Sequence, residues 1–241
     1  MQSRFVLGIM AFAVLLLTAC NGKSAQEEIY DHLEKAVSLE DTFREQQQPL
    51  VDLENKENDL YNQIIDLSMD EFDKIKKLSS KAADIVEQRK EKLEMEKESI
   101  DSAKEEFDKI KPLISEMDED KKEAKDKADE LYDTMQKRYD AYQDLYKSYK
   151  TALKHDSELY KMLQNKDLKE EDLQAQIKQI NSTYDEVIEA NKQFNSYTEK
   201  YNQLKKEFYE AAGLKVEYEE SGNNNSGSSN DKSESGSGSG E

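Results

Sequence analysis

The chain has 241 residues, 37% of them charged, and a formal net charge of −19 at pH 7. Nucleic acids and anionic lipid headgroups attract proteins through basic surfaces, so this acidity argues against binding to either polyanion. Residues 23–212 contain two prolines and no glycine, a composition that is typical of long helices and argues against a sheet-based domain.

The first 19 residues have the pattern of an export signal. Arg4 precedes an apolar run at 5–17 that is too short to span a bilayer. Leu17-Thr18-Ala19-Cys20 follows and matches the bacterial lipobox, in which the cysteine thiol receives a diacylglyceryl group. We therefore predict a lipoprotein signal peptide over residues 1–19 and a lipidated tether over residues 20–27. An ordinary secretory signal with a chance cysteine is the alternative.

Cys20 is the only cysteine, so no intramolecular disulfide can form and its thiol is free for lipidation. Each buried methylene of an acyl chain contributes about 0.8 kcal/mol, so diacylglycerol and palmitate chains on Cys20 would anchor the protein stably. The predicted location is the extracytoplasmic face of the cell membrane. Asn21 follows the cysteine, so the Asp that marks inner-membrane retention in Gram-negative sorting is absent.

Apolar residues recur at seven-residue spacing in four segments of residues 28–213. The clearest columns are Ile29, Ala36, Phe43 and Leu50; Leu93, Ile100, Phe107 and Ile114; Ala124, Leu131, Leu145 and Ala152; and Ile180, Val187, Phe194 and Tyr201. Polar residues interrupt them at His32, Gln46, Glu57, Ser79, Arg89 and Glu96. This spacing predicts an all-α fold, an elongated antiparallel four-helical up-and-down bundle with coiled-coil packing.

Helix boundaries have their own signals. Ser68 and Asp167 each stand three residues before a glutamate, which predicts capping boxes at the start of new helices. Gly213 predicts a left-handed residue that ends the last helix.

The two prolines raise separate questions. Pro112 and the charged segment at 118–127 predict a turn near residues 112–119. One continuous helix of about 95 residues is the alternative, because the apolar phase runs on from Met117 to Ala124. Pro49 does not change the phase of its segment, so it predicts a kink rather than a helix end.

Residues 214–241 are rich in Ser, Gly and Asn, and we predict a disordered tail. A frayed terminus without a role is one interpretation, and a spacer that threads into a surrounding polymer is the other.

The sequence gives no sign of catalysis. The two histidines, His32 and His155, are far apart, so we expect no metal site. Carboxylates are too numerous for their spacing to indicate an acid–base pair, and a long bundle is expected to lack a concave pocket that could tune a pKa. We predict that the protein is not an enzyme and binds no cofactor.

Tyrosines gather on one edge of the third segment. They are Tyr132, Tyr139, Tyr142, Tyr146, Tyr149 and Tyr160. Most are expected to be core or core-rim residues whose hydroxyls reach water. The alternative is that some stack on the sugar rings of glycan strands, and Tyr139 and Tyr146 are the candidate contacts with a glycan or another partner.

Several segments resemble one known family. They are the lipobox, Ile29-Tyr30-Asp31-His32-Leu33-Glu34, Glu45-Gln46-Gln47-Gln48-Pro49-Leu50, Asp70-Glu71-Phe72-Asp73-Lys74-Ile75 and Glu96-Lys97-Glu98-Ser99-Ile100. Together they resemble the YkyA-like lipoproteins of Gram-positive bacteria, whose proposed role is cell-wall binding. The resemblance covers about residues 1–215 and implies a membrane-anchored helical protein that faces the wall.

The leading functional prediction is a non-catalytic surface lipoprotein that contacts peptidoglycan or a wall-associated protein through one face of the bundle. The alternative is a structural spacer between membrane and wall with no specific ligand. A solute-binding lipoprotein is disfavoured, because such receptors have a two-lobed α/β cleft.

Overall fold

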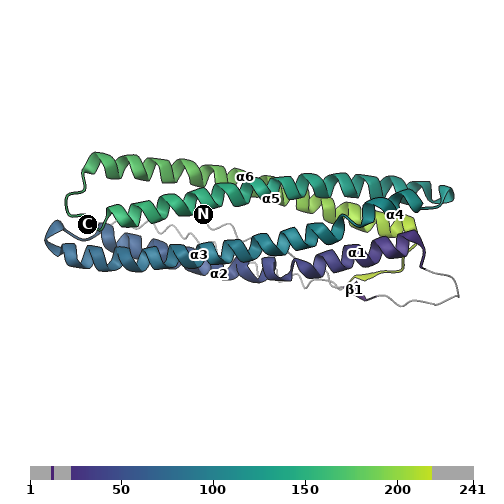
Figure 1. Cartoon of the computed structure of the whole chain (residues 1–241), viewed down its shortest axis with the longest axis horizontal. Coiled ribbons are helices and arrows are strands. Elements are labelled where there is room, and N and C mark those ends of the chain that lie inside the picture. The colour runs from purple at the N-terminus through teal and green to yellow at the C-terminus, as the bar shows by residue number, and fades with distance from the viewer. Residues whose placement is uncertain (1–11, 14–22, 219–241) are drawn as a thin grey trace, which may run out of the picture.

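The computed structural model describes residues 12–13 and 23–218. In this part of the chain, four long helical arms run antiparallel to one another (Figure 1). Helices α1 (Ala25–Leu39) and α2 (Asp41–Ile65) form the first arm, and α3 (Phe72–Phe107) and α4 (Ile110–Glu116) form the second. Helices α5 (Lys122–Met162) and α6 (Glu170–Ala212) are the third and fourth arms. The predicted all-α bundle is confirmed.

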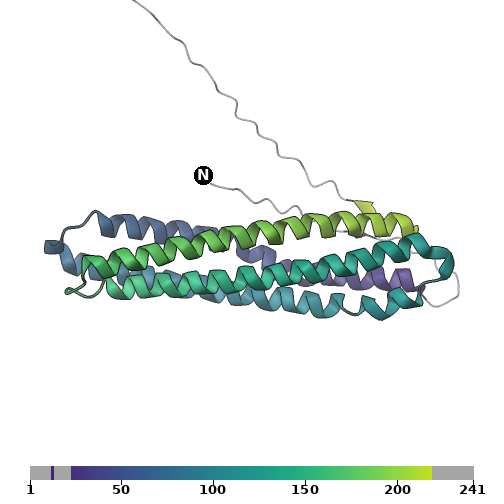
Figure 2. The same cartoon turned by 90° about the horizontal axis from the view of Figure 1, so that it is seen from above.

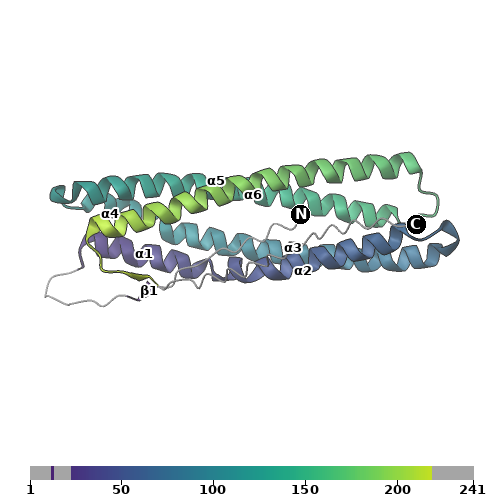
Figure 3. The ribbon, with the colours of Figure 1, turned by 180° about the vertical axis from the view of Figure 1, so that it is seen from behind.

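The arms pair as two hairpins. Helix α2 packs on α3, α6 packs on α5, and contacts between α3 and α5 join the hairpins. Figure 1 faces the α3–α5 side of the bundle, and Figure 3 faces the α2–α6 side. The 43 residues of α6 give the bundle a length of about 65 Å.

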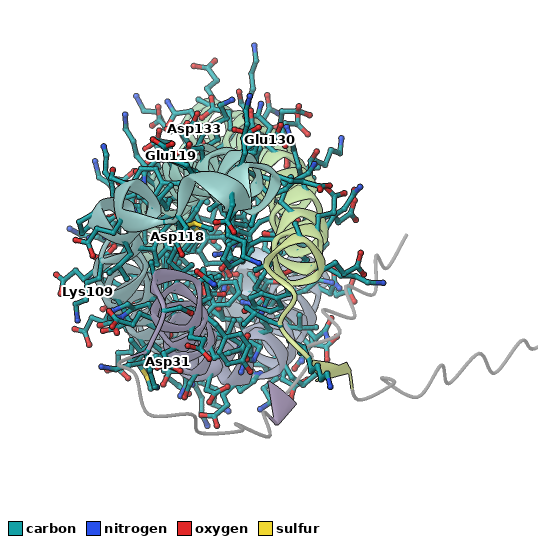
Figure 4. All side chains as sticks on the ribbon, turned by 90° about the vertical axis from the view of Figure 1, so that its right-hand side faces the viewer. Asp31, Lys109, Asp118, Glu119, Glu130 and Asp133 are labelled. Atoms are coloured by element: carbon teal, nitrogen blue, oxygen red, sulfur yellow. The ribbon has the colours of Figure 1, made fainter. Side chains whose placement is uncertain are left out.

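Both ends of the helical chain lie at one end of the bundle. Helix α1 begins there and α6 ends there, while the turns at 66–71 and 163–169 lie at the opposite end (Figure 2). Figure 4 looks at the first of these ends and shows the side chains of Asp31, Lys109, Glu130 and Asp133 around its outside. This end is therefore charged around its rim.

The core follows the seven-residue columns. Its most deeply buried side chains, all without solvent exposure, include those of Ile29, Leu33, Phe107, Ile110, Leu131 and Phe208. Three apolar clusters lie along the bundle, and the polar residues that interrupt the columns are buried with them, Ser79, Arg89 and Glu96 included. The interruptions are therefore part of the core.

The first arm is interrupted at Glu40, between α1 and α2, by a side chain from another helix. The Ser99 hydroxyl donates to the Leu39 carbonyl at 2.6 Å and accepts from the Phe43 N–H at 3.1 Å. It thus occupies the place of the helical hydrogen bond between these backbone groups, an established cause of helix bending. Helix α2 continues through Pro49, so the prediction that this proline does not end the helix is confirmed.

A turn separates the second and third arms, so the alternative of one continuous helix is wrong. Met117 and Asp118 are extended, with ψ of 139° and 145°, and the short helix η2 (Glu119–Lys121) follows. Pro112 is the third residue of α4, where a backbone N–H has no partner within the helix. A proline is therefore tolerated there, and the turn lies at the far end of the predicted range.

The predicted caps have mixed outcomes. Gly213 is left-handed with φ of 73°, and the Leu214 N–H donates to the Tyr209 carbonyl at 3.0 Å, so the predicted end of α6 is confirmed. Ser68 precedes the short helix η1 (Met69–Glu71), and its side chain forms no cap hydrogen bond. Lys169 occupies the N-cap position of α6 and its side chain forms no cap hydrogen bond, so the predicted capping role of Asp167 is wrong.

Two short strands complete the described chain. Strand β1 (Phe12–Ala13) pairs antiparallel with β2 (Glu217–Tyr218). The rest of the N-terminal segment, at 1–11 and 14–22, lies outside the described residues, and so does the segment 219–241. The first of these segments includes Cys20. The lipidation, the domain limits and the disordered tail therefore stay predictions.

Ser99→Ala should lower the free energy of unfolding by about 1–3 kcal/mol, because the buried backbone groups at Leu39 and Phe43 lose their shared partner. Urea unfolding of the full-length chain, followed by circular dichroism, measures the change. Ser102→Ala is the control, because this exposed hydroxyl bonds only to the Glu98 carbonyl of its own helix. Equal effects of the two substitutions would contradict the role given to Ser99.

Candidate functional site

Three tyrosines of α5 form a ladder with acidic residues of the second arm. The Tyr132 hydroxyl donates to Asp108 at 3.3 Å, and the Tyr139 hydroxyl donates to Asp101 at 3.0 Å. The third rung joins the Tyr146 hydroxyl to the Glu94 carboxylate at 2.8 Å. Because α3 and α5 are antiparallel, partners recur every seven residues, with numbers that increase along α5 and decrease along α3. We call this set the tyrosine ladder; it lies along the α3–α5 seam that faces the viewer in Figure 1.

Lysines connect the rungs of the ladder. The ammonium group of Lys97 lies 5.5 Å from the centroid of the Tyr146 ring and pairs with Asp101 of the next rung. That of Lys104 lies 5.2 Å from the centroid of the Tyr139 ring and pairs with Asp108 at 2.5 Å. Each lysine thus makes a cation–π contact with one rung and an ion pair with the next. The seam is a continuous network.

The ladder tyrosines are half-buried rather than free in solvent. Burial, with the Asp101 carboxylate, raises the pKa of Tyr139 to about 12, so its phenol stays protonated at neutral pH. The expected core-rim position is confirmed for these three tyrosines, and their hydroxyls donate to carboxylates. The seam therefore presents to solvent the partly exposed side chains of Tyr139 and Tyr146 beside partly exposed carboxylates.

A second polar cluster lies inside the bundle around Arg89, which is 2% exposed. Its guanidinium donates to Glu57 at 2.6 Å and to Asp156 at 3.3 Å. Further donations go to Glu54 at 3.2 Å and to the hydroxyls of Tyr149 at 2.8 Å and Tyr184 at 2.9 Å. These partners come from α2, α5 and α6, so one side chain of α3 joins all four arms. Burial raises the pKa of Glu57 and of Asp156, although Arg89 opposes the shift.

Two other buried cations are paired in the same way. The Arg138 guanidinium donates to both carboxylate oxygens of Glu40, at 2.6 and 2.8 Å, and to the Thr198 hydroxyl at 2.9 Å. Lys205 reaches Glu34 at 3.3 Å. A buried cation needs such partners, because removing a charge from water costs several kcal/mol. These pairs are structural, and they tie the first arm to the second hairpin.

Residues of α2 and α6 contribute to the walls of two cavities, on the side of the bundle that Figure 3 faces. One, of about 310 Å³, borders the Arg89 cluster. The other, of about 500 Å³, extends from Val51 on α2 and Ile188 on α6 to Glu96 and Tyr142 in the interior. We call it the core cavity. The expectation that the bundle lacks a concave pocket is wrong, because α2 and α6 pack on α3 and α5 rather than closely on each other.

The histidines lie on the edges of the core. His32 is within hydrogen-bond distance of Glu106 at 2.8 Å, and His155 is 3.4 Å from Glu158. Among the described residues, no group of three or more His, Cys, Asp and Glu is placed to hold a metal ion. None of the described helices is long and apolar enough to span a membrane.

Sequence analysis missed three buried charged residues that stand at positions of the apolar columns. Arg138, Asp156 and Lys205 continue the apolar columns of their helices at seven-residue steps, yet all three are buried. A charged residue at a core position was thus the available signal. The ladder had a signal as well, because Lys97, Lys104 and Lys111 repeat at the same interval as its tyrosines.

Comparison with known proteins gives one family. Residues 24–211 match the model of the YkyA family, described as "Putative cell-wall binding lipoprotein". The "Uncharacterized lipoprotein YkyA" of Bacillus subtilis (strain 168) is 38% identical over 210 residues, which cover 87% of this chain and 93% of the relative. A crystal structure of a conserved protein of unknown function from Staphylococcus aureus matches with a TM-score of 0.65 and 19% identity, over 76% of this chain and 93% of that one. This last likeness shows the fold alone.

Glu96 should make stability depend on pH. Burial raises its pKa from an ordinary 4.5 to about 8, so the native chain holds a proton that the unfolded chain releases. The free energy of unfolding should therefore fall as pH rises from about 5 to about 8, and Glu96→Gln should flatten this decline. Urea unfolding across that range measures the slope. The exposed Glu98→Gln is the control, and a wild-type slope in Glu96→Gln would contradict the assignment.

Proposed function

Because the chain belongs to the YkyA family of lipoproteins described as "Putative cell-wall binding lipoprotein", we propose that it is a non-catalytic surface lipoprotein that contacts the wall. In this proposal, acyl chains on Cys20 anchor it to the extracytoplasmic face of the membrane. The tyrosine ladder is the contact surface for peptidoglycan or a wall-associated protein. The family is a lipoprotein family and not an enzyme family, which supports the non-catalytic part.

The repeat of the ladder is the observation that carries this proposal. Rungs seven residues apart recur about every 10.5 Å along α5. A glycan strand is a polymer of repeating sugar units, so a straight surface with its own repeat can meet it at several equivalent points. Each rung offers an aromatic ring, a carboxylate and an ammonium group, which suit the apolar faces, hydroxyls and amides of sugars. No basic patch is required, in agreement with the acidic composition.

Tyr139 and Tyr146 form two successive rungs and are the proposed contacts. Both keep a part of the ring at the surface, while the hydroxyls are held by Asp101 and Glu94. A ring fixed in this way loses little freedom when a ligand binds, which favours affinity. In a peptidoglycan contact the sugars would stack on the ring faces and displace the lysines that cover them.

The spacer is the second candidate. A charged rod of about 65 Å, with the start of α1 at one end, could separate two surfaces without a ligand. The two proposals differ in what they require of the ladder, because a spacer needs only that the ladder keep the helices together.

Cys20→Ser should abolish the incorporation of a labelled fatty acid when the full-length chain is expressed in Gram-positive cells. The expected reason is that no other residue offers a thiol to the diacylglyceryl transfer. After cell fractionation, the variant should be absent from the lipid-anchored proteins of the membrane fraction. Label retained by Cys20→Ser, or absent from the wild type, would contradict the proposed anchor.

Replacing both Tyr139 and Tyr146 with alanine should weaken binding of the full-length chain to purified peptidoglycan roughly tenfold. Two ring contacts are lost, each worth about 0.5–1.5 kcal/mol. Co-sedimentation of the detergent-solubilised protein with peptidoglycan measures the dissociation constant.

The matched control for this experiment is the double replacement of Tyr61 and Tyr197 with alanine. These tyrosines are also half-buried, but they belong to α2 and α6 and lie outside the ladder. Circular dichroism confirms that both variants keep their helices. Equal retention of the two variants would exclude the ladder as the contact surface and favour the spacer.

A further inference from the structure

The core cavity has the build of a ligand site. Its volume of about 500 Å³ lies within the range of small-molecule pockets in proteins. Val51 and Ile188, which are 47% and 53% exposed, line it on α2 and α6, so the cavity reaches the surface between these helices. Leu50 and Val187 add to its apolar walls. Such walls suit an apolar chain.

Glu96 is the exceptional residue of this cavity. It is 5% exposed, and its carboxyl accepts a hydrogen bond from the Gln47 amide at 2.5 Å. Among the described residues, no basic side chain lies within ion-pair distance of it, whereas the buried Glu57 pairs with Arg89. A buried carboxyl without a cation is the arrangement that proteins usually avoid.

Tyr142 gives a second, independent sign of a missing ligand. Tyr142 is 1% exposed and lines the same cavity, yet its hydroxyl has no hydrogen-bond partner among the residues that the structure describes. Most buried hydroxyls in native proteins have a partner, and an exception calls for an explanation. Glu96 and Tyr142 thus leave two hydrogen-bonding groups in one apolar cavity.

The aromatic rings around these groups favour a cation. Phe43, Tyr142 and Phe194 pack together with ring centroids 5.5–5.9 Å apart, and all three line the cavity. Ring faces attract cations, as the guanidinium of Arg138 shows at 4.9 Å from the centroid of Phe194.

We propose that the core cavity binds a primary ammonium group carried on an alkyl chain. The ammonium group donates hydrogen bonds to the Glu96 carboxylate and to the Tyr142 hydroxyl oxygen. The alkyl chain lies against Leu50 and Val187 and extends toward the mouth at Val51 and Ile188. The core cavity shares Tyr146 with the tyrosine ladder. The groups that hold the ammonium, Glu96 and Tyr142, are not part of the ladder, so this proposal does not depend on the wall contact.

The charge of the head group should decide which ligand the core cavity binds most tightly. An alcohol of the same shape leaves the Glu96 carboxyl without a cation. A carboxylate meets Glu54 as well as Glu96, and Lys192 is the only cation among the described residues that line the cavity. The chain as a whole carries a charge of −19, so cations are also drawn to its surface.

Binding of a cation should release a proton. Burial raises the pKa of Glu96 to about 8, so the empty cavity holds a protonated carboxyl at neutral pH. The other titratable groups that line the cavity are Glu54 from α2, Tyr142, Tyr146 and Tyr149 from α5, and Lys192 from α6. The ligand keeps its positive charge while Glu96 ionises, so about one proton leaves for each ligand bound at pH 7.

Three probes with the same tail and different heads test the proposal: n-hexylamine, 1-hexanol and hexanoate. Isothermal titration of the detergent-solubilised full-length chain, in two buffers of different ionisation enthalpy, gives both affinity and proton release. Hexylamine should bind roughly tenfold more tightly than either other probe and alone should release a proton.

A fourth probe, Nα-acetyl-lysine amide, carries the same ammonium group on a peptide unit. Its binding would assign the site to peptide-borne amines, and preference for hexylamine would assign it to free ones.

Glu96→Gln should remove both the preference for hexylamine and the proton release, while the exposed Glu98→Gln should keep both. Tyr142→Phe, which deletes only the unpartnered hydroxyl, should weaken hexylamine binding several-fold and leave the fold intact. Equal binding of hexylamine and hexanol, or proton release that persists in Glu96→Gln, would overturn the proposal.

Discussion

Arg89 carries a permanent charge into the middle of the bundle, and such a charge is tolerated only where its partners are in place. Its partners come from three other helices, so an axial slip of any of them would leave a buried charge unpaired, at a cost of about 3–5 kcal/mol. The apolar columns alone would allow a slip by seven residues, because they repeat at that interval. The buried ion pairs of Arg89 and Arg138 therefore set the register of the arms, and the apolar residues supply the burial.

The sequence predicted what is local or strictly periodic, and it missed what depends on two distant segments. The helices, the turn before α5 and the left-handed Gly213 follow from spacing and backbone preferences. The interruption at Glu40 depends on the Ser99 hydroxyl of another helix, and nothing near Glu40 signals it. In the same way, the tyrosines of the third arm were visible, but their pairing with carboxylates required the register of α3 against α5. Partners across a bundle cannot be identified until that register is known.

The two sides of the bundle differ in how completely they are packed. On one side the tyrosine ladder joins α3 to α5 through rings, carboxylates and lysines. On the other, α2 and α6 remain apart, and the core opens to solvent between Val51 and Ile188. The networked α3–α5 side suits a large partner with a repeating structure. The open α2–α6 side suits a small molecule. The two features meet at Tyr146, which is a rung of the ladder and also lines the core cavity.

The shared end of α1 and α6 has a mechanical consequence. A tether at the N-terminal side and a wall polymer held along α5 would pull on the bundle parallel to its axis. Under such tension, neighbouring helices slide past each other, so many side-chain contacts resist at the same time instead of opening one after another. The Glu40–Arg138 pair bridges the first arm and α5, and it would carry part of this shear directly. The architecture suits a protein stretched between a fluid layer and a stiff one.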